Sequence, residues 1–358
     1  MKPIRVKFLS KTPVDRMAPL WQTLVPQDGF PGVAFTFDPE ARDYDVFAVY
    51  EDLPPRPGER GILRSEPLAC PRERTLLITT EPSSIRVSGY NYLRQFGTVW
   101  TSVPYPQKRV RHHREGHPRW ELTPPPLRWF YGRDLEGDDH WPVERLEASP
   151  RKTADLSTVC SSKAMGHTVH AQRLAFTMAL KARLGNALSL YGRGFDPVGD
   201  KAEAMAPYRY HLAIENHRQP GHITEKLTDC FLAECLPFYF GAPDYTRYFP
   251  KDAVIPIDIF DLDAAERIIR TAIREDAYAK RREAIREAKA ITMSDFNALG
   301  GVARFAHAVM KEDVTSRPGS VIHGRHAYRK AHPFRATVDV VQSAMVKRSR
   351  LGRPVQDA

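Results

Sequence analysis

This chain has little cysteine and no long apolar run, and we expect no secretory leader. Its four cysteines include no C-x-x-C pair, which excludes the redox and zinc motifs of that spacing and favours reduced, buried thiols. No window approaches the ~20 consecutive apolar residues of a membrane helix, so we expect no spanning helix. The opening residues, MKPIRVKFLSKTP, lack the apolar core of a signal peptide and are typical of a first strand, which predicts a cytoplasmic protein.

What the chain does contain is enough apolar and aromatic surface for folded domains. Hydrophobic residues make up 42% of the sequence and aromatic residues 10%, which is typical of a globular protein. A length of 358 residues suits two domains of ordinary size, each able to bury its own core.

Positive charge is concentrated near the C-terminus. The net charge is +10, and residues 311–358 hold ten Lys and Arg against four Asp and Glu. A basic tail of this kind indicates an anionic partner, such as lipid headgroups, an acidic glycan or nucleic acid. The alternative is a solvated extension without a partner.

The first 150 residues differ in composition from the rest of the chain, because they hold 20 of the 30 prolines. Short strand patterns lie between their proline-rich loops, at residues 4–9, 33–37, 45–50 and 75–80. From residue 151 onward strands alternate with helices, which predicts a parallel sheet of Rossmann type. We therefore expect an irregular α/β domain over residues 1–150, a regular one over 151–310 and a basic tail over 311–358.

The stretch from Tyr208 to Pro250 is the most informative part of the sequence. It has the pattern of a strand at 210–214, a polar loop, a helix and a second strand at 236–240. In such a βαβ unit several polar residues lie where the first strand ends and the helix begins: Asn216, His222, Thr224, Glu225 and Lys226. Open α/β sheets bind ligands at that edge, and the free N–H groups of a helix start favour phosphate.

The same stretch resembles the donor-site motif of the glycosyltransferase family ten fucosyltransferases. The family pattern runs Glu-Asn-Ser, a short loop, Tyr-x-Thr-Glu-Lys, a helix and Pro-x-x-x-Gly-x-Pro. This chain has the corresponding residues in the same order, as Glu215-Asn216, His222-Ile-Thr-Glu-Lys226, and Pro237 followed by Gly241 and Pro243. The likeness covers roughly residues 156–300 well and residues 1–150 only faintly. It implies a GT-B-like α/β fold in which two Rossmann-type domains face a cleft.

Two cations are candidates for holding the diphosphate of a nucleotide sugar. A cation in the first turn of a helix opposes the macrodipole, so Lys226 is oddly placed unless an anion binds there. Arg173 lies at the start of a predicted helix, where the family has a diphosphate-binding arginine, and its planar fork suits phosphate oxygens. The alternative for each is an ordinary exposed helix residue, with Glu225 satisfying the dipole beside Lys226.

The remaining donor-site residues follow from the resemblance. It implies that Glu215 and Asn216 position the donor and that Glu225 hydrogen-bonds the ribose, while Thr224 can cap the helix. The chain departs from the family where a histidine follows Asn216 and where His222 replaces the tyrosine. The second departure leaves the identity of the donor sugar open, although the nucleotide is less affected.

The catalytic base should be a carboxylate at the end of a strand in the first domain. Glu81 ends one predicted strand, while Glu51 and Asp52 end another, and position alone does not choose between them. The family has its proposed base in a Glu-Ser-Pro element, and Glu81-Pro82-Ser83 resembles a shortened form of it. The resemblance therefore favours Glu81, whose alternative is a capping or salt-bridged surface residue.

No metal is implied. Asp261 and Asp263 form an Asp-x-Asp tripeptide, which we interpret as helix capping at Asp263. His112, His113 and His117 lie among five Lys and Arg that would repel a metal ion, so a loop touching an anionic acceptor is the better interpretation.

These observations predict an inverting glycosyltransferase that moves fucose, or a related sugar, from a GDP-sugar to a glycan hydroxyl. The acceptor would belong to bacterial envelope polysaccharide or lipopolysaccharide, with the basic tail placing the enzyme at the inner face of the cytoplasmic membrane. No cofactor is essential, and no nucleic acid is expected as a partner. Two alternatives remain open: a transferase of the same fold that uses a different GDP-sugar, and a basic glycan- or nucleic-acid-binding protein without enzymatic activity.

Overall fold

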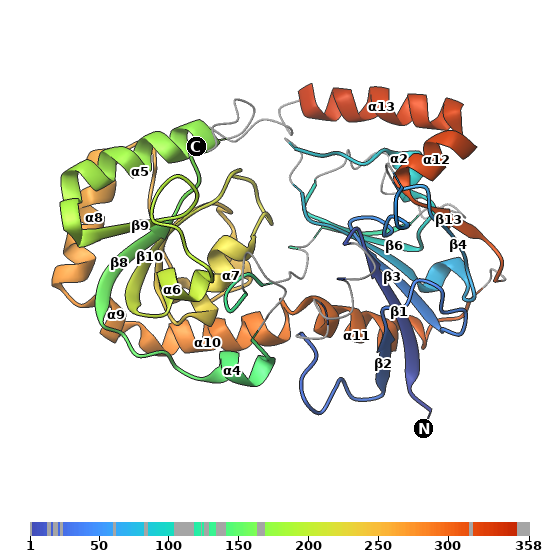
Figure 1. The fold of residues 1–358 in the computed structure, drawn as a ribbon, viewed down its shortest axis with the longest axis horizontal. Helices are drawn as coiled ribbons and strands as arrows, with labels where there is room; N and C mark the ends of the chain where they lie inside the picture. The colour runs from blue at the N-terminus through green and yellow to red at the C-terminus, as the bar shows by residue number, and fades with distance from the viewer. Residues whose placement is uncertain are drawn as a thin grey trace. The chain divides into compact units, whose positions relative to one another are not determined.

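The computed structural model describes residues 2–12, 16, 21, 24–59, 62–81, 85–103, 118–122, 124, 129–133, 141–162, 169–314 and 318–348. The chain folds into two compact units, drawn as a ribbon in Figure 1. Unit 1 comprises Met1–Pro126 together with Ala298–Arg353, and unit 2 comprises Leu127–Asn297.

Unit 1 is built on a six-stranded parallel sheet. In spatial order its strands are β2 (Val33–Thr36), β1 (Ile4–Ser10), β3 (Val46–Tyr50), β5 (Thr75–Thr79), β6 (Thr98–Thr101) and β7 (Arg119–Leu122). Most residues of the central strands β1, β3, β5 and β6 are buried, as expected for a parallel sheet covered on both faces. The chain runs from β1 to β2 on one side and to β3 on the other. The carboxyl ends of β1 and β3 therefore lie at a topological switch point, where α/β sheets bind ligands.

The C-terminal segment folds onto unit 1. Helix α11 (Ala298–Val309) packs against β1, and β13 (Val321–His323) pairs antiparallel with β4 (Ser65–Pro67). Helices α12 (Arg325–Ala331) and α13 (Pro333–Arg348) follow, and α13 lies against the short α2 (Tyr90–Leu93). The described part of the basic tail is thus folded structure.

Unit 2 carries the expected Rossmann-type sheet. Its five parallel strands are, in spatial order, β12 (Ile255–Pro256), β11 (Leu236–Phe240), β10 (Tyr208–Ile214), β8 (Ala154–Val159) and β9 (Leu188–Tyr191). The connection from β8 leads to β9 on one side, and β10 returns to the other side. The switch point of this sheet is therefore at the carboxyl ends of β8 and β10.

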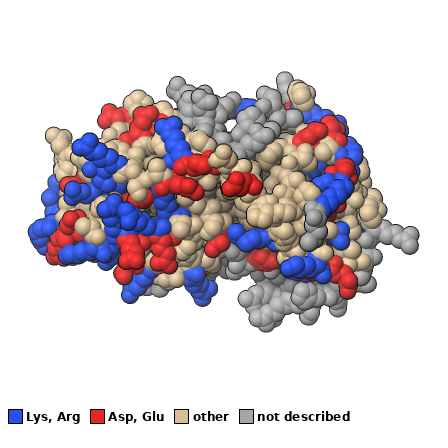
Figure 2. All heavy atoms as spheres, turned by 90° about the horizontal axis from the view of Figure 1, so that it is seen from below, with Lys and Arg blue, Asp and Glu red and all other residues tan. Residues whose placement is uncertain are grey.

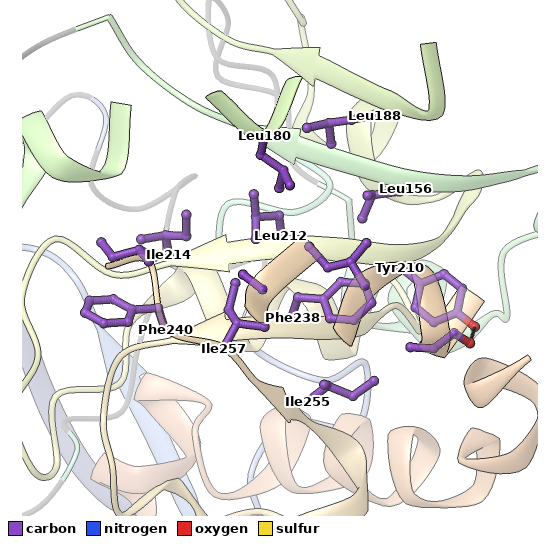
Figure 3. Packing of buried hydrophobic residues seen from close by; sticks show 14 of the residues in the cluster. Leu156, Leu180, Leu188, Tyr210, Leu212, Ile214, Phe238, Phe240, Ile255 and Ile257 are labelled. Atoms are coloured by element: carbon purple, nitrogen blue, oxygen red, sulfur yellow. Dashed lines mark hydrogen bonds between the residues drawn. The ribbon is translucent and has the colours of Figure 1, made fainter. Parts of the chain in front are cut away.

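One face of this sheet forms the core of unit 2. Alternate residues of β10, namely Tyr210, Leu212 and Ile214, pack with Leu156 and Phe238 on one face, as Figure 3 shows. Helices α5 (His170–Leu184), α8 (Leu262–Arg274) and α9 (Ala277–Lys280) contribute to the same cluster. The other α-helices described in unit 2 are α4 (Val143–Glu147), α6 (Lys201–Met205), α7 (Glu225–Leu232) and α10 (Arg282–Ser294), and α10 adds Ile285 to the same cluster. Of these, α6 contacts β8 and β10, and α10 contacts α7.

The fold class expected from the sequence, two Rossmann-type α/β domains, is confirmed by the two parallel sheets. The unit boundaries fall after residues 126 and 297, whereas the sequence suggested residues 150 and 310. The four cysteines are free and buried, as predicted. The capping interpretation was wrong in one detail, because Asp261 caps α8 and Asp263 instead pairs with Arg183.

The surface of unit 2 carries charge of both signs. Figure 2 shows Lys and Arg interspersed with Asp and Glu over the helices of this unit on the visible face. Along α10 the exposed residues alternate in this way, as in Arg282-Glu283 and Arg286-Glu287. That face of unit 2 is therefore a solvated surface of mixed charge without a stripe of one sign.

Candidate donor site

A cavity of about 170 Å³ opens at the switch point of unit 2. Its walls come from the ends of β8 and β10, the first turns of α5 and α7, and α6. The lining residues are Val159, Ser161, Arg173, Lys201, Met205, His211, Leu212, Ala213, Ile214, Glu225 and Lys226. Three of the predicted donor residues, Arg173, Glu225 and Lys226, therefore lie around one space.

Glu215 supports this cavity from behind. It directly follows β10, is fully buried, and accepts hydrogen bonds from the Thr224 backbone N–H (2.9 Å) and hydroxyl (2.6 Å). A Cβ atom at position 241 would lie 2.6 Å from Cγ of Glu215. Gly241, which directly follows β11, therefore allows the end of that strand to pass close to Glu215. Glu215 thus ties the end of β10 to the start of α7.

Lys226 lies among anionic and polar groups at the start of α7. Its Nζ is 2.9 Å from a Glu225 carboxylate oxygen, 3.1 Å from the Thr224 hydroxyl and 3.5 Å from a Glu215 carboxylate oxygen. Burial opposes the charged form, but the two glutamates outweigh burial and raise the pKa of Lys226. The ammonium group is therefore held in the charged state at the cavity wall. Thr224 caps α7 as predicted, because its hydroxyl accepts from the Lys226 backbone N–H.

Glu225 is the one carboxylate on the cavity wall formed by the described residues. Burial alone would raise its pKa, but the charges of Lys226 and Lys201 outweigh burial and lower it to about 2. Glu225 is consequently an acceptor of hydrogen bonds at any physiological pH. A carboxylate in that state suits a sugar hydroxyl, which donates.

Arg173 is the least compensated charge in the site. It lies in the first turn of α5 with 7% of its surface exposed, and its Nε has no hydrogen-bond partner within the described residues. Arg173 also forms no ion pair with any of the described residues. A buried guanidinium without a counter-charge is costly, so the site is prepared for an anionic ligand.

Lys201 was missed by the sequence analysis. It begins α6, and its Nζ lies 2.8 Å from the buried carboxylate of Asp229 in α7. The capping box of Asp200 and Glu203 is the sequence signal that could have identified it. This motif predicts a helix that starts at Lys201, shortly before β10 begins at Tyr208.

Four predicted donor residues do not line the cavity: Glu215 and Thr224, which join β10 to α7, and also Asn216 and His222. The Asn216 backbone C=O accepts from Val169 N–H, and the Asn216 side-chain oxygen is buried without a partner among the described residues. The buried ring of His222 stacks edge-on against His217 with 5.7 Å between ring centres. Burial lowers the pKa of His222 to about 3, so this side chain is neutral.

The three carboxylates considered as the catalytic base all belong to unit 1, and they differ in burial and in their hydrogen-bond partners. Glu51, at φ +71°, is buried and accepts from Thr80 and from Arg86 at 2.6 Å. Asp52 is fully buried and accepts from Arg325 at 2.6 Å. The side chain of Glu81 is 35% exposed and lies 3.9 Å from Lys11. A base must reach the proton it removes, and of the three Glu81 is the most accessible.

No group of three or more His, Cys, Asp and Glu that could hold a metal occurs among the described residues. His112, His113 and His117 lie outside them. No helix in the described part of the chain is both long and apolar enough to cross a bilayer.

Comparison with known proteins relates the part of the chain that carries this cavity to one family of glycosyltransferases. Residues 150–312 match the family model described as "Glycosyltransferase family 10 (fucosyltransferase) C-term". The human 4-galactosyl-N-acetylglucosaminide 3-alpha-L-fucosyltransferase FUT6 is 34% identical over 93 residues, which is 25% of each chain. The Helicobacter pylori alpha-(1,3)-fucosyltransferase FucT is 33% identical over 69 residues, 19% of this chain and 14% of that protein. This chain thus spans a quarter or less of the length of these curated relatives.

Among solved structures, an alpha1,3-fucosyltransferase with GDP covers 87% of this chain and 91% of its own, with 15% identity and a TM-score of 0.48. That likeness is too loose to place individual residues. The family model, in contrast, spans every strand of the sheet and every residue around the cavity. Residues 150–312 of this chain are a glycosyltransferase family 10 (fucosyltransferase) domain.

Proposed function

We propose that this protein transfers fucose, or a closely related sugar, from a GDP-sugar to a hydroxyl of a glycan, with inversion at the anomeric carbon. The observation that carries the proposal is the uncompensated, buried guanidinium of Arg173 on the same cavity as Lys226 and Glu225. Cations at a helix start stabilise the diphosphate as negative charge develops on it. The GDP-sugar is a substrate, and no resident cofactor is part of the proposal.

In the proposed reaction, Glu81 removes the proton of the acceptor hydroxyl as its oxygen attacks the anomeric carbon. The bond between that carbon and the diphosphate oxygen breaks on the opposite face, so a β-linked donor gives an α-linked product. Lys226 and Arg173 hold the departing GDP, and Glu225 accepts from a hydroxyl of the ribose. Asn216 and His222 do not line the cavity, and in this proposal they shape the donor site indirectly.

GDP binding tests the donor site most directly. Arg173→Ala is a clean variant because no described residue loses a hydrogen bond to the guanidinium. We expect GDP affinity, measured by calorimetry, to fall roughly 10- to 100-fold, the size of a lost charge-assisted hydrogen bond. The matched control is Arg267→Ala, an exposed arginine of α8 outside the cavity. Equal GDP affinity in Arg173→Ala and Arg267→Ala would contradict the assignment.

The base and the donor sugar need separate measurements. Glu81→Gln should keep GDP affinity while turnover of a GDP-sugar falls at least ~100-fold, the usual contribution of a general base. A panel of nucleotide sugars, scored by mass spectrometry for retained and consumed donor, distinguishes fucose from another GDP-linked sugar. Salt-sensitive binding to DNA with no nucleotide sugar retained would favour the non-enzymatic alternative.

We further propose that the enzyme works at the inner face of the cytoplasmic membrane, on envelope polysaccharide or lipopolysaccharide precursors. Helix α13 supports this location. Phe334, Val341 and Met345 are 81%, 49% and 65% exposed and share one helix face, because they lie seven and four residues apart. Residues 325–348 hold six Lys and Arg against one acid, Asp339. An apolar face with surrounding cations suits the interface of an anionic bilayer.

Flotation with phosphatidylglycerol vesicles tests this location. The double variant Phe334→Ser and Met345→Ser should lose most of the bound fraction, and phosphatidylcholine vesicles should bind little of the unaltered protein. Ile268→Ser, which removes an exposed apolar residue from α8, is the control and should bind as before. Undiminished binding by the α13 variant, or a change only in self-association, would disprove this use of the helix.

A further inference from the structure

Unit 1 contains a second cavity, of about 370 Å³, that none of the donor-site residues touches. It lies between the segment 86–92 and the helices α12 and α13. The residues that line it are Arg86, Val87, Ser88, Gly89, Tyr92, Arg325, Tyr328, Arg329, Ala336, Asp339, Val340, Ser343 and Ala344. Its volume lies within the ~300–1,000 Å³ of small-molecule sites.

Two arginines anchor this cavity to the ligand-binding edge of the sheet. Arg86 donates to Glu51 at 2.6 Å and Arg325 to Asp52 at 2.6 Å, and both acids directly follow β3 at the switch point. Arg86 uses Nη1 for this bond and Arg325 uses its side-chain Nε. A guanidinium has five N–H donors, so each arginine retains donors that no hydrogen bond within the described residues occupies.

The third arginine leaves the cavity with excess positive charge. The side chain of Arg329 forms no hydrogen bond or ion pair with any described residue. The one acid in the wall, Asp339, is fully engaged: its two oxygens accept from Asn91 N–H, the Asn91 side-chain amide and Tyr92 N–H, each at 2.9 Å. The wall therefore offers donors and a free positive charge without a free carboxylate.

The rest of the wall is apolar and aromatic. Tyr92 and Tyr328 are buried to 4% and 3% exposure, and Val87 and Ala336 complete a surface on which a sugar ring can lie. Arginine forks beside an apolar wall suit a sugar with an acidic substituent, because the fork pairs with a carboxylate or phosphate in a bidentate manner.

The cavity is also linked to the proposed base within unit 1. Lys11 lies 3.8 Å from a carboxylate oxygen of Glu51 and 3.9 Å from one of Glu81. Glu51 in turn holds Arg86, which lines the cavity. One short chain of ion pairs thus runs from the cavity wall to Glu81, so a sugar held there would extend from a fixed point near the base.

We propose that this cavity binds the carboxylate or phosphate group of an acidic acceptor glycan. The inference rests on the proposed function, since it names the class of acceptor. It predicts that neutral glycans are poorer acceptors than acidic ones of the same size.

Titration of the full chain by NMR with three probes tests the proposal: D-glucuronic acid, glucose 6-phosphate and glucose. We expect at least one acidic probe to bind roughly tenfold or more tightly than glucose, and the pair distinguishes carboxylate from phosphate. Arg329→Ala should weaken the acidic probe about tenfold, whereas Lys330→Ala, the adjacent exposed cation outside the cavity, should not. Equal binding of all three probes, or equal losses in the two variants, would overturn the proposal.

GDP titrated into the same samples separates the two hypotheses. Arg329→Ala should bind GDP like the unaltered protein, because Arg329 is not part of the donor cavity. If GDP binds and no acidic probe does, the acceptor inference fails and the proposed function stands. If an acidic probe binds and GDP does not, the proposed function fails, whereas the binding of an acidic sugar in this cavity is confirmed.

Discussion

At the scale of single residues, Lys226 has two roles that can be separated. It presents a cation to the cavity, and it also compensates Glu215, whose pKa is raised by burial and lowered again in part by this lysine. Lys226→Met should therefore abolish measurable GDP binding and also destabilise the protein by about 1–3 kcal/mol, because a buried carboxylate loses its counter-charge.

Adding Glu215→Gln to Lys226→Met tests this separation. The neutral amide no longer needs a cation, so we expect the free energy of unfolding, measured with urea, to recover in part. GDP binding should stay absent because the phosphate ligand is still missing. If the double variant bound GDP again, Lys226 would act only as a structural partner of Glu215.

Two buried histidines predict acid sensitivity. Burial lowers the pKa of His211 and of His222 to about 3, whereas a histidine in the unfolded chain titrates near pH 6.5. Between these values the unfolded chain binds more protons, so stability falls as the pH decreases. From pH 7 to pH 5 each histidine should cost about 2 kcal/mol. His222→Tyr, which restores the family residue, should reduce that loss by about this amount in urea unfolding at the two pH values. An unchanged loss would mean that His222 is accessible to protons in the folded state.

Residue identity at the donor site could be predicted where a motif fixed it, and not where only three-dimensional contacts do. The polar residues that follow a strand indicated the positions of Glu225 and Lys226, and the family resemblance indicated Arg173 on α5, a helix that precedes that strand in the chain. Lys201 lies outside that motif. It lines the cavity because α6 packs against β8 and β10. The engagement of Glu51 with Thr80 and Arg86, which leaves Glu81 the accessible acid, depends on pairings between strands that sequence spacing does not reveal.

At the scale of elements, one carboxylate fixes α13 to unit 1. Asp339 accepts three hydrogen bonds from Asn91 and Tyr92 and thereby caps the start of α2. A side chain at Gly89 would collide with this carboxylate, so the two helices lie in direct contact. Asp339→Ala should lower the free energy of unfolding by about 1–2 kcal/mol, the cost of a lost cap, and increase hydrogen exchange in α12 and α13 before the rest of unit 1. Uniform exchange across unit 1 would show that α13 is not a separate stability element.

Elements with a strong period were predictable, and elements that depend on distant partners were not. The two strands expected at 210–214 and 236–240 lie within two residues of the observed bounds of β10 and β11, because parallel strands buried on both faces leave largely apolar runs. Strands β6 and β7 were missed because they are only four residues long and depend on pairing with their neighbours, β6 with β5 and β7 with β6. Helices α12 and α13 lie in a segment whose charge suggested a solvated tail, and their burial against α2 was not visible in the sequence.

At the scale of the whole molecule, the described part of the chain crosses between units twice, after residues 126 and 297. The sequence suggested that the regular domain ends at residue 310, since helical patterns continue to that point. In the structure α11 belongs to unit 1, where it packs against β1 and buries most of its length. A change in amino-acid composition shows where the sequence becomes more regular. A domain boundary depends instead on which hydrophobic core a helix packs against.

This difference predicts how fragments behave. A fragment of residues 127–297 contains the whole of unit 2 and should unfold cooperatively and bind GDP. A fragment of residues 127–310 adds α11 without its partner strand, and so exposes an apolar helix that includes Leu299, Val302 and Phe305, all buried in the full chain. We expect the longer fragment to bind a hydrophobic dye and to self-associate in analytical ultracentrifugation, although its GDP affinity should match that of the shorter one. A longer fragment that is monomeric and binds no dye, beside a shorter one that fails to fold, would place α11 in the donor domain and restore the boundary at residue 310.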